Sequence, residues 1–115
     1  MNMGSFENRD LFPGALEMMI LQTLRRQPSH GYALVQQIRR ASNELLQVEE
    51  GSLYPALQRM LKAGLVKARW EVSSTGRRVR TYELTARGAT HLEREISKFE
   101  RMLEGISLVL APVKP

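Results

Sequence analysis

The stretch GSLYPALQRMLKAGL, residues 51–65, has the pattern of one amphipathic helix. On a wheel of about 100° per residue, the apolar arc consists of Leu53, Leu57, Met60 and Leu61, with Ala56 and Tyr54 at its edges. The opposite arc consists of Ser52, Pro55, Gln58, Arg59 and Lys62. Because proline is tolerated in the first turn of a helix, Pro55 predicts a helix over residues 52–63, with Ser52 or Gly51 as its N-cap and Gly64 as its stop.

The polar arc of this helix has two interpretations. Hydroxyl, amide and cationic side chains read base edges and bind phosphates, which would place the helix in the major groove of DNA. The alternative is an ordinary amphipathic helix with a solvated face. The residues that follow favour DNA.

After Gly64 the apolar period changes from that of a helix to two. Val66, Ala68, Trp70 and Val72 alternate with charged residues, which predicts a half-buried strand over residues 66–72. A turn composition, SSTGRR at residues 73–78, precedes a second strand over residues 79–84. The two strands form a β-hairpin, the wing of a winged helix-turn-helix, with Arg77, Arg78 and Arg80 positioned for phosphates or the minor groove; a solvated tip is the alternative. We expect Trp70 to point into the core, with an effector pocket as the second interpretation.

The charge of the chain is concentrated around this hairpin. The 115 residues carry a formal charge of +5. Residues 59–87 contain eight cations and two anions, a balance of +6, so the rest of the chain sums to −1. A basic segment on a nearly neutral scaffold is typical of a surface that binds a polyanion.

Two further helices are expected before residue 51. One starts at Pro13 and ends near Gln27, and its apolar surface is wider than one contact requires, which indicates either a second subunit or full burial. Ser29 is expected to cap the next helix, whose apolar stripe is Gly31, Leu34, Val35 and Ile38, with His30 as a local hydrogen-bonding group. Residues 42–50 link it to the stretch 51–65 as a short tether or strand, and Glu49 and Glu50 are expected to point away from DNA. Residues 1–12 show no periodicity, which predicts a flexible arm.

The last helix is predicted over residues 85–110, capped by Thr85 and followed by a tail at 111–115. Its apolar residues follow alternating steps of three and four, a heptad seam formed by Ala89, Leu92, Ile96, Phe99, Leu103, Ile106 and Leu110. A small domain has too little core to bury both this seam and the first helix. We therefore expect a homodimer through Leu92, Ile96, Phe99, Leu103, Ile106 and Leu110; folding back on its own domain is the alternative.

Four segments together carry a resemblance to a known family. HGYAL at 30–34, EEGSLYPALQRM at 49–60, KAGLV at 62–66 and GRRVRTYELTARG at 76–88 resemble the PadR family of bacterial transcriptional regulators, in the short form with one C-terminal helix. The resemblance implies a dimeric winged helix-turn-helix repressor of promoter DNA, and it leaves open release by a small-molecule effector without identifying one. Carried over by position, Ser52, Tyr54, Pro55 and Arg59 correspond to the reading helix, and Gly76, Arg77, Arg78, Arg80 and Tyr82 to the wing. Thr81 departs from the family pattern, which often has an aromatic residue there.

The sequence thus predicts an α+β, mostly α protein: a winged helix-turn-helix domain over residues 13–84 with a two-stranded wing, and a long dimerisation helix. With no cysteine, no metal-spaced ligands and only His30 and His91, nothing points to an enzyme, a metal or a cofactor. No apolar run reaches about 18 residues, so we expect a soluble, cytoplasmic protein without a membrane partner. The expected partners are double-stranded promoter DNA and a second copy; a small basic RNA-binding protein or an oligomerisation adaptor is the alternative.

Overall fold

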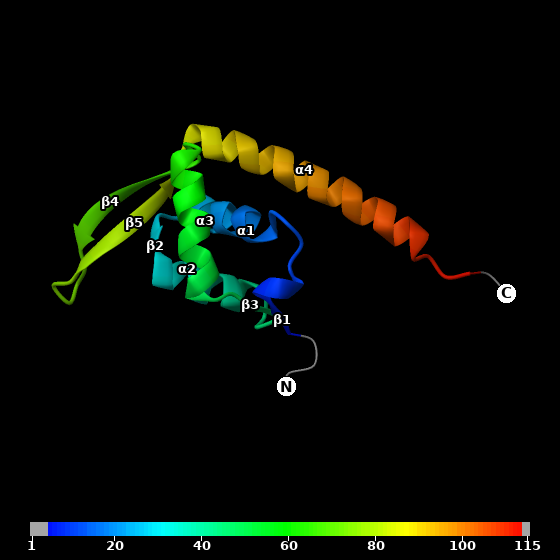
Figure 1. The fold of residues 1–115 in the computed structure, drawn as a ribbon, viewed down its shortest axis with the longest axis horizontal. Helices are drawn as coiled ribbons and strands as arrows, with labels where there is room; N and C mark the ends of the chain where they lie inside the picture. The colour runs from blue at the N-terminus through cyan, green and yellow to red at the C-terminus, as the bar shows by residue number, and fades with distance from the viewer. Residues whose placement is uncertain (1–4, 114–115) are drawn as a thin grey trace.

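The computed structural model describes residues 5–113 and has the predicted mixed architecture (Figure 1). Three helices, α1 (Ala15–Arg26), α2 (Gly31–Ala41) and α3 (Glu50–Lys62), pack around one core beside a hairpin of β4 (Val66–Val72) and β5 (Arg78–Leu84). A long fourth helix, α4 (Ala86–Val109), extends away from the core, and the hairpin projects on the opposite side (Figure 1). This is the winged helix-turn-helix fold expected from the sequence.

The core is built mainly by the apolar stripes of the three packed helices, to which the hairpin adds Val66 and Tyr82 and α4 adds Leu92. On α2, the predicted stripe of Gly31, Leu34, Val35 and Ile38 is buried. The largest fully buried side chains are Ile20, Leu21, Leu34, Leu53, Leu57, Met60 and Leu92. Helix α2 begins one residue later than predicted, since its N-cap is His30, whose Nδ1 accepts a hydrogen bond from the Ala33 N–H at 3.4 Å. His30 is therefore the local capping group, and Ser29 is not the cap.

Ser29 instead belongs to a third strand that the sequence pattern does not predict. The two-residue strand β2 (Ser29–His30) pairs antiparallel with β5, giving the sheet order β2-β5-β4. Ser29 lies opposite Tyr82, and its hydroxyl accepts a hydrogen bond from Gln37 Nε2 at 3.0 Å. The wing is thereby fixed to the start of α2.

The N-terminal segment is structured over the residues that the structure describes. Strand β1 (Phe6–Glu7) pairs in parallel with β3 (Leu46–Gln47), and a 3-10 turn, η1 (Asn8–Asp10), follows β1. Phe12 then stacks on Phe99 of α4, with ring centroids 5.3 Å apart. Where the sequence, lacking periodicity, predicts a flexible arm over residues 1–12, the structure thus has a paired strand and a turn within residues 5–12, because β3 supplies backbone hydrogen bonds. Residues 1–4 lie outside the described residues.

Helix α3 begins two residues before the predicted start. Its N-cap is Glu49, which makes no side-chain capping bond, while the Glu49 carbonyl accepts from the N–H groups of Ser52 and Leu53 at 3.1 Å each. Pro55 consequently lies in the second turn, and its missing N–H leaves the carbonyl of the exposed Gly51 to solvent. The predicted stop is confirmed: Gly64 has φ +75°, and the Leu65 N–H closes the helix on the Met60 carbonyl at 2.9 Å.

Helix α4 starts at the predicted cap, Thr85, whose hydroxyl accepts from the Gly88 N–H at 3.0 Å. Its heptad seam divides into two halves. Leu92 is buried in the core of its own chain, and Ile96 packs against that core. Leu103, Ile106 and Leu110 are 51%, 49% and 74% exposed. Folding back on its own domain, the alternative interpretation of the seam, therefore describes its first half. No helix within residues 5–113 is long and apolar enough to cross a membrane.

Candidate nucleic-acid interface

The exposed side of α3 contains most of the residues predicted to read DNA. Tyr54, Pro55, Gln58, Arg59 and Lys62 are exposed, and Ser52 is half-buried. The opposite side, with Leu53, Ala56, Leu57 and Met60, is buried. At about 100° per residue, the centre of the exposed side falls on Pro55, Gln58 and Lys62, whereas Tyr54 and the pair Ser52 and Arg59 lie on its two flanks.

Arg59 is tied to α1 on its flank. Its guanidinium donates a hydrogen bond to Glu17 Oε1 of α1, and the two form an ion pair. Arg59 and Ser52 line one depression together with Phe12, Gly14 and Glu17. The carboxylate compensates the charge of Arg59 and draws its head group towards α1. Lys62, in contrast, makes no ion pair within the described part of the chain.

Tyr54 lies on the other flank, against the start of α2. A Cβ atom built on Gly31 would be 2.7 Å from the Tyr54 hydroxyl oxygen, so the ring rests directly on the glycine backbone. Partial burial, followed by the nearby charges of Glu50 and Tyr82, raises the pKa of the Tyr54 phenol. Tyr54 therefore stays a neutral hydroxyl at physiological pH, able to donate and accept hydrogen bonds.

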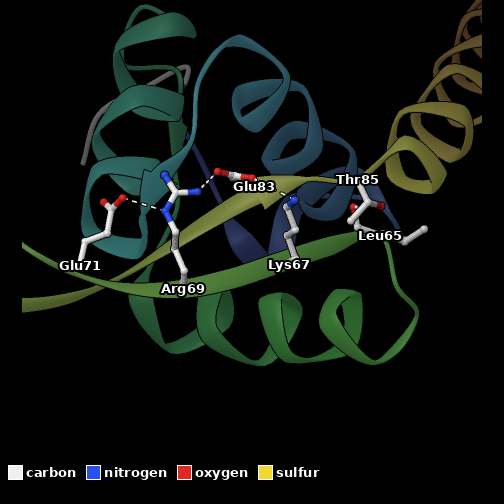
Figure 2. A network of polar contacts seen from close by, with 6 residues as sticks. All are labelled: Leu65, Lys67, Arg69, Glu71, Glu83 and Thr85. Atoms are coloured by element: carbon white, nitrogen blue, oxygen red, sulfur yellow. Dashed lines mark hydrogen bonds and ion pairs between the residues drawn. The ribbon is translucent and has the colours of Figure 1, made fainter.

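The two faces of the wing differ in charge. Opposite residues of an antiparallel pair share a face, so the β4–β5 register places Lys67, Arg69, Glu71, Val79, Thr81 and Glu83 on one face. Figure 2 shows how the charges of this face compensate one another: Arg69 pairs with Glu71 at 2.8 Å and with Glu83, and Lys67 pairs with Glu83 at 3.5 Å. The hydrogen bond from the Thr81 hydroxyl, followed by that from Arg69, lowers the pKa of Glu71. We call this the paired face.

The other face of the wing is formed by Ala68, Trp70, Val72, Arg78, Arg80 and Tyr82. It is apolar and buried near the core, where Tyr82 is 4% exposed, and cationic towards the tip. Arg78 lies over the Trp70 ring at 4.9 Å, and Arg80 lies 5.8 Å from the Tyr82 ring centroid. No acidic residue lies on this face, which we call the arginine face.

The predicted wing residues therefore separate into accessible and inaccessible ones. Arg77, Arg78 and Arg80 are exposed, and none of them is in an ion pair within residues 5–113. Gly76 forms the turn with φ +81°, a conformation that favours glycine. Tyr82 is a core residue, which makes its side chain an unsuitable DNA contact.

The expectation that Trp70 points into the core is wrong. The alternation of β4 is real, but the hairpin extends beyond the helices, so that Trp70 is 60% and Val72 is 71% exposed. Tyr32, which was not among the predicted site residues, is 55% exposed in the first turn of α2. The sequence could have indicated this exposure, because Tyr32 is the aromatic residue of HGYAL and lies outside the apolar stripe of α2. Glu49 and Glu50 are exposed at the start of α3, and their direction relative to DNA stays a prediction.

These features define a class, the winged helix-turn-helix proteins. Comparison with known proteins narrows the class to a family. The sequence profile of the PadR-like family of transcriptional regulators matches residues 20–94. The chain belongs to this family, as the resemblance at His30–Leu34 and in the later segments predicted.

Solved structures agree with this assignment. A transcriptional regulator from Clostridium thermocellum is 28% identical, with a TM-score of 0.75 over 82% of this chain and 88% of that chain. A PadR-like transcriptional regulator from Bacillus cereus is 28% identical, with a TM-score of 0.74 over 87% of this chain and 95% of that chain. Bacillus subtilis PadR, solved in complex with operator DNA, shares the fold at 20% identity and a TM-score of 0.63, over 88% of this chain and 49% of that chain.

Proposed function

We propose that this PadR-like transcriptional regulator is a dimeric repressor that binds a pseudo-palindromic site in promoter DNA. The observation that carries the proposal is the pairing of charges. Lys62 and the wing residues Arg77, Arg78 and Arg80 have no acidic partner within residues 5–113, whereas Lys67, Arg69 and Arg59 have one. Some cations of α1, α2 and α4 are also unpaired within that range, but Lys62 and the wing-tip arginines lie on the two elements that a winged helix-turn-helix presents to DNA. Their charges suit a ligand that supplies phosphates, and operator DNA is the ligand in the B. subtilis PadR complex.

Within this proposal the contacts have different roles. Gln58 and Lys62, near the centre of the exposed side of α3, would face base edges, with Tyr54 and Pro55 beside them and Ser52 and Arg59 on the flank towards α1. Arg77, Arg78 and Arg80 would bind phosphates along the neighbouring groove, with Gly76 shaping the turn. Tyr82 supports the wing from the core.

The dimer is proposed from the apolar surface that the chain leaves uncovered. Leu103, Ile106 and Leu110 of α4 are exposed, and beside them α1, α2 and α4 enclose an open groove of about 430 Å³ lined by residues such as Met18, Met19, Ile96 and Phe99. A second copy that lays its α4 across this groove would cover both surfaces about a two-fold axis. Release of the repressor by a small-molecule effector stays a prediction from the family resemblance.

The DNA proposal is tested with the fragment upstream of the protein's own gene, titrated with salt against a scrambled duplex of equal length. The Arg77→Ala/Arg78→Ala variant should lower the affinity for both duplexes alike and reduce the salt slope by about 0.9 for each phosphate that the variant no longer neutralises. Gln58→Ala should instead reduce the discrimination between the duplexes by roughly 1–3 kcal/mol. Equal affinity of the unaltered protein for both duplexes would contradict sequence-specific binding.

The dimer proposal is tested by sedimentation at several protein concentrations. Leu103→Lys/Ile106→Lys should shift the protein towards monomers, because each protomer would bury two cations at the axis. Arg101→Lys, an exposed change on the same helix that keeps the charge, is the control. A monomeric unaltered protein would contradict the dimer.

A further inference from the structure

Trp70 is a large aromatic side chain that the core does not use. It lies in the outer half of β4, is 60% exposed and is the only tryptophan in the chain. An exposed tryptophan leaves a large apolar surface in contact with water, which does not stabilise a free monomer. Contact with a partner is therefore its ordinary explanation. Val72, the next residue on the same face, is 71% exposed and extends this surface to the wing tip.

The neighbours of Trp70 define the chemistry of that partner. Trp70 lies opposite Arg80 in the register, and Arg78 covers its ring at 4.9 Å. Both arginines lack an acidic partner within the described residues, and the carboxylates of the hairpin, Glu71 and Glu83, lie on the paired face. A partner for this surface must offer negative charge and an apolar or flat group a few ångströms apart.

We infer that Trp70 is a DNA-contacting residue, whose ring packs on a deoxyribose of the minor-groove wall while Arg78 and Arg80 bind the flanking phosphates. This inference rests on the proposed DNA binding and adds that only the arginine face of the wing meets the backbone. An acidic protein would match the arginines, but DNA places phosphates on both sides of a sugar, which suits one arginine, Arg78, over the ring and another, Arg80, opposite Trp70 on the neighbouring strand. The paired face has no net charge to contribute, because Lys67 and Arg69 are balanced by Glu71 and Glu83.

The single tryptophan makes the test direct. Intrinsic fluorescence reports on Trp70 alone, while the anisotropy of a labelled promoter duplex reports binding independently. On saturation with unlabelled duplex, acrylamide quenching of Trp70 should fall at least twofold. Trp70→Ala should weaken duplex binding about fivefold to tenfold, and Trp70→Phe should restore most of that affinity, because a flat apolar ring suffices.

Val79→Ala is the matched control, since Val79 lies on the paired face of the same hairpin, opposite Glu71; it should leave the affinity unchanged. Urea unfolding of each variant at one protein concentration checks that the fold is intact. Duplex binding with Trp70 still fully open to acrylamide would overturn the inference and leave the proposed function standing. Absence of duplex binding by anisotropy would overturn both. Protection of Trp70 by raising the protein concentration without DNA would also overturn it, in favour of contact between copies.

Discussion

Gly88 should be the glycine of α4 that cannot be replaced, although alanine is the better helix former. The first turn of α4 lies on the end of α3: the Thr85 N–H donates to the Leu65 carbonyl at 3.1 Å, and the Thr85 hydroxyl contacts the Gly64 carbonyl at 2.7 Å. A Cβ on Gly88 would be 2.7 Å from Leu84 Cδ1 and 2.9 Å from the Leu65 carbonyl carbon, and nearer still to its oxygen. The Leu84 side chain can rotate, but the Leu65 backbone cannot.

The magnitude follows from these contacts. Overpacking against a fixed backbone costs about 1–3 kcal/mol, and the forced shift of α4 also weakens the Thr85 cap, which is worth about 1 kcal/mol. The helix propensity of alanine returns up to about 1 kcal/mol. Gly88→Ala should therefore destabilise the protein by about 2 kcal/mol. Gly105→Ala, in the same helix but with nothing within 4 Å of its Cβ and outside the heptad seam, should stabilise it by about 0.5–1 kcal/mol.

The assay is urea unfolding followed by circular dichroism, with both variants and the unaltered protein at one concentration, because association shifts apparent stability. The two substitutions are chemically identical and should shift the midpoint in opposite directions. A Gly88→Ala protein as stable as the unaltered one would refute the close approach of α4 to Leu65.

Two further predictions concern the polar contacts of the site. Glu17→Gln should free the Arg59 cation, which raises the DNA affinity and steepens the salt slope by up to about 0.9 per additional phosphate neutralised. The increase in affinity should vanish when Arg59→Gln is added. The control is Glu93→Gln, which breaks the ion pair between Arg25 of α1 and Glu93 of α4 and should leave the affinity unchanged. Thr81→Val should raise the pKa of Glu71, measured by NMR titration of its carboxyl group, because it removes the hydrogen bond that is the largest cause of the lowering. Since the pKa of Glu71 in the folded protein lies below the ordinary value of 4.5, its ionised carboxylate stabilises the fold above that pH, and this stabilisation is lost as the pH falls through the folded pKa. Thr81→Val should reduce this dependence of stability on acid pH. An unchanged pKa of Glu71 in the variant would contradict the hydrogen bond.

Local patterns predicted the elements whose order is visible within a few residues. The stripe of α2, the hairpin with Gly76 in its turn and the Thr85 cap each need only neighbouring positions, and all are present. The short strands β1, β2 and β3 have two residues each, which is too few for a period, although the sequence offers a strand as one interpretation of residues 42–50, where β3 lies. Their partners lie tens of residues away, so only the folded chain brings them together.

The candidate site shows a different limit. The sequence identified the cationic residues, but a cation that already pairs with a carboxylate is less available to bind a phosphate of DNA. Glu17 precedes Arg59 by 42 residues, and its ion pair with Arg59 follows from the packing of α1 on α3. Likewise the alternation in β4 correctly placed Trp70 on the face of Val66, but not beyond the edge of the core. Periodicity gives the face of a residue, and the length of the hairpin relative to the helices decides its exposure.

The seam of α4 shows why a regular repeat does not by itself define an interface. Leu92, Ile96 and Phe99 belong to the same repeat of alternating steps of three and four as Leu103, Ile106 and Leu110, but the first three pack on their own chain. The free half of the seam then offers fewer than two heptads, and isolated coiled coils of that length are marginal in water. If the protein is the dimer we propose, α4 cannot hold it together alone, and the partner's helix must also cover the groove beside Met18 and Met19 of α1. From the sequence, full burial within one chain would explain the wide apolar surface of α1 equally well. Because half of the seam is occupied within the protomer, however, the proposed dimer needs this surface of α1 as part of its interface.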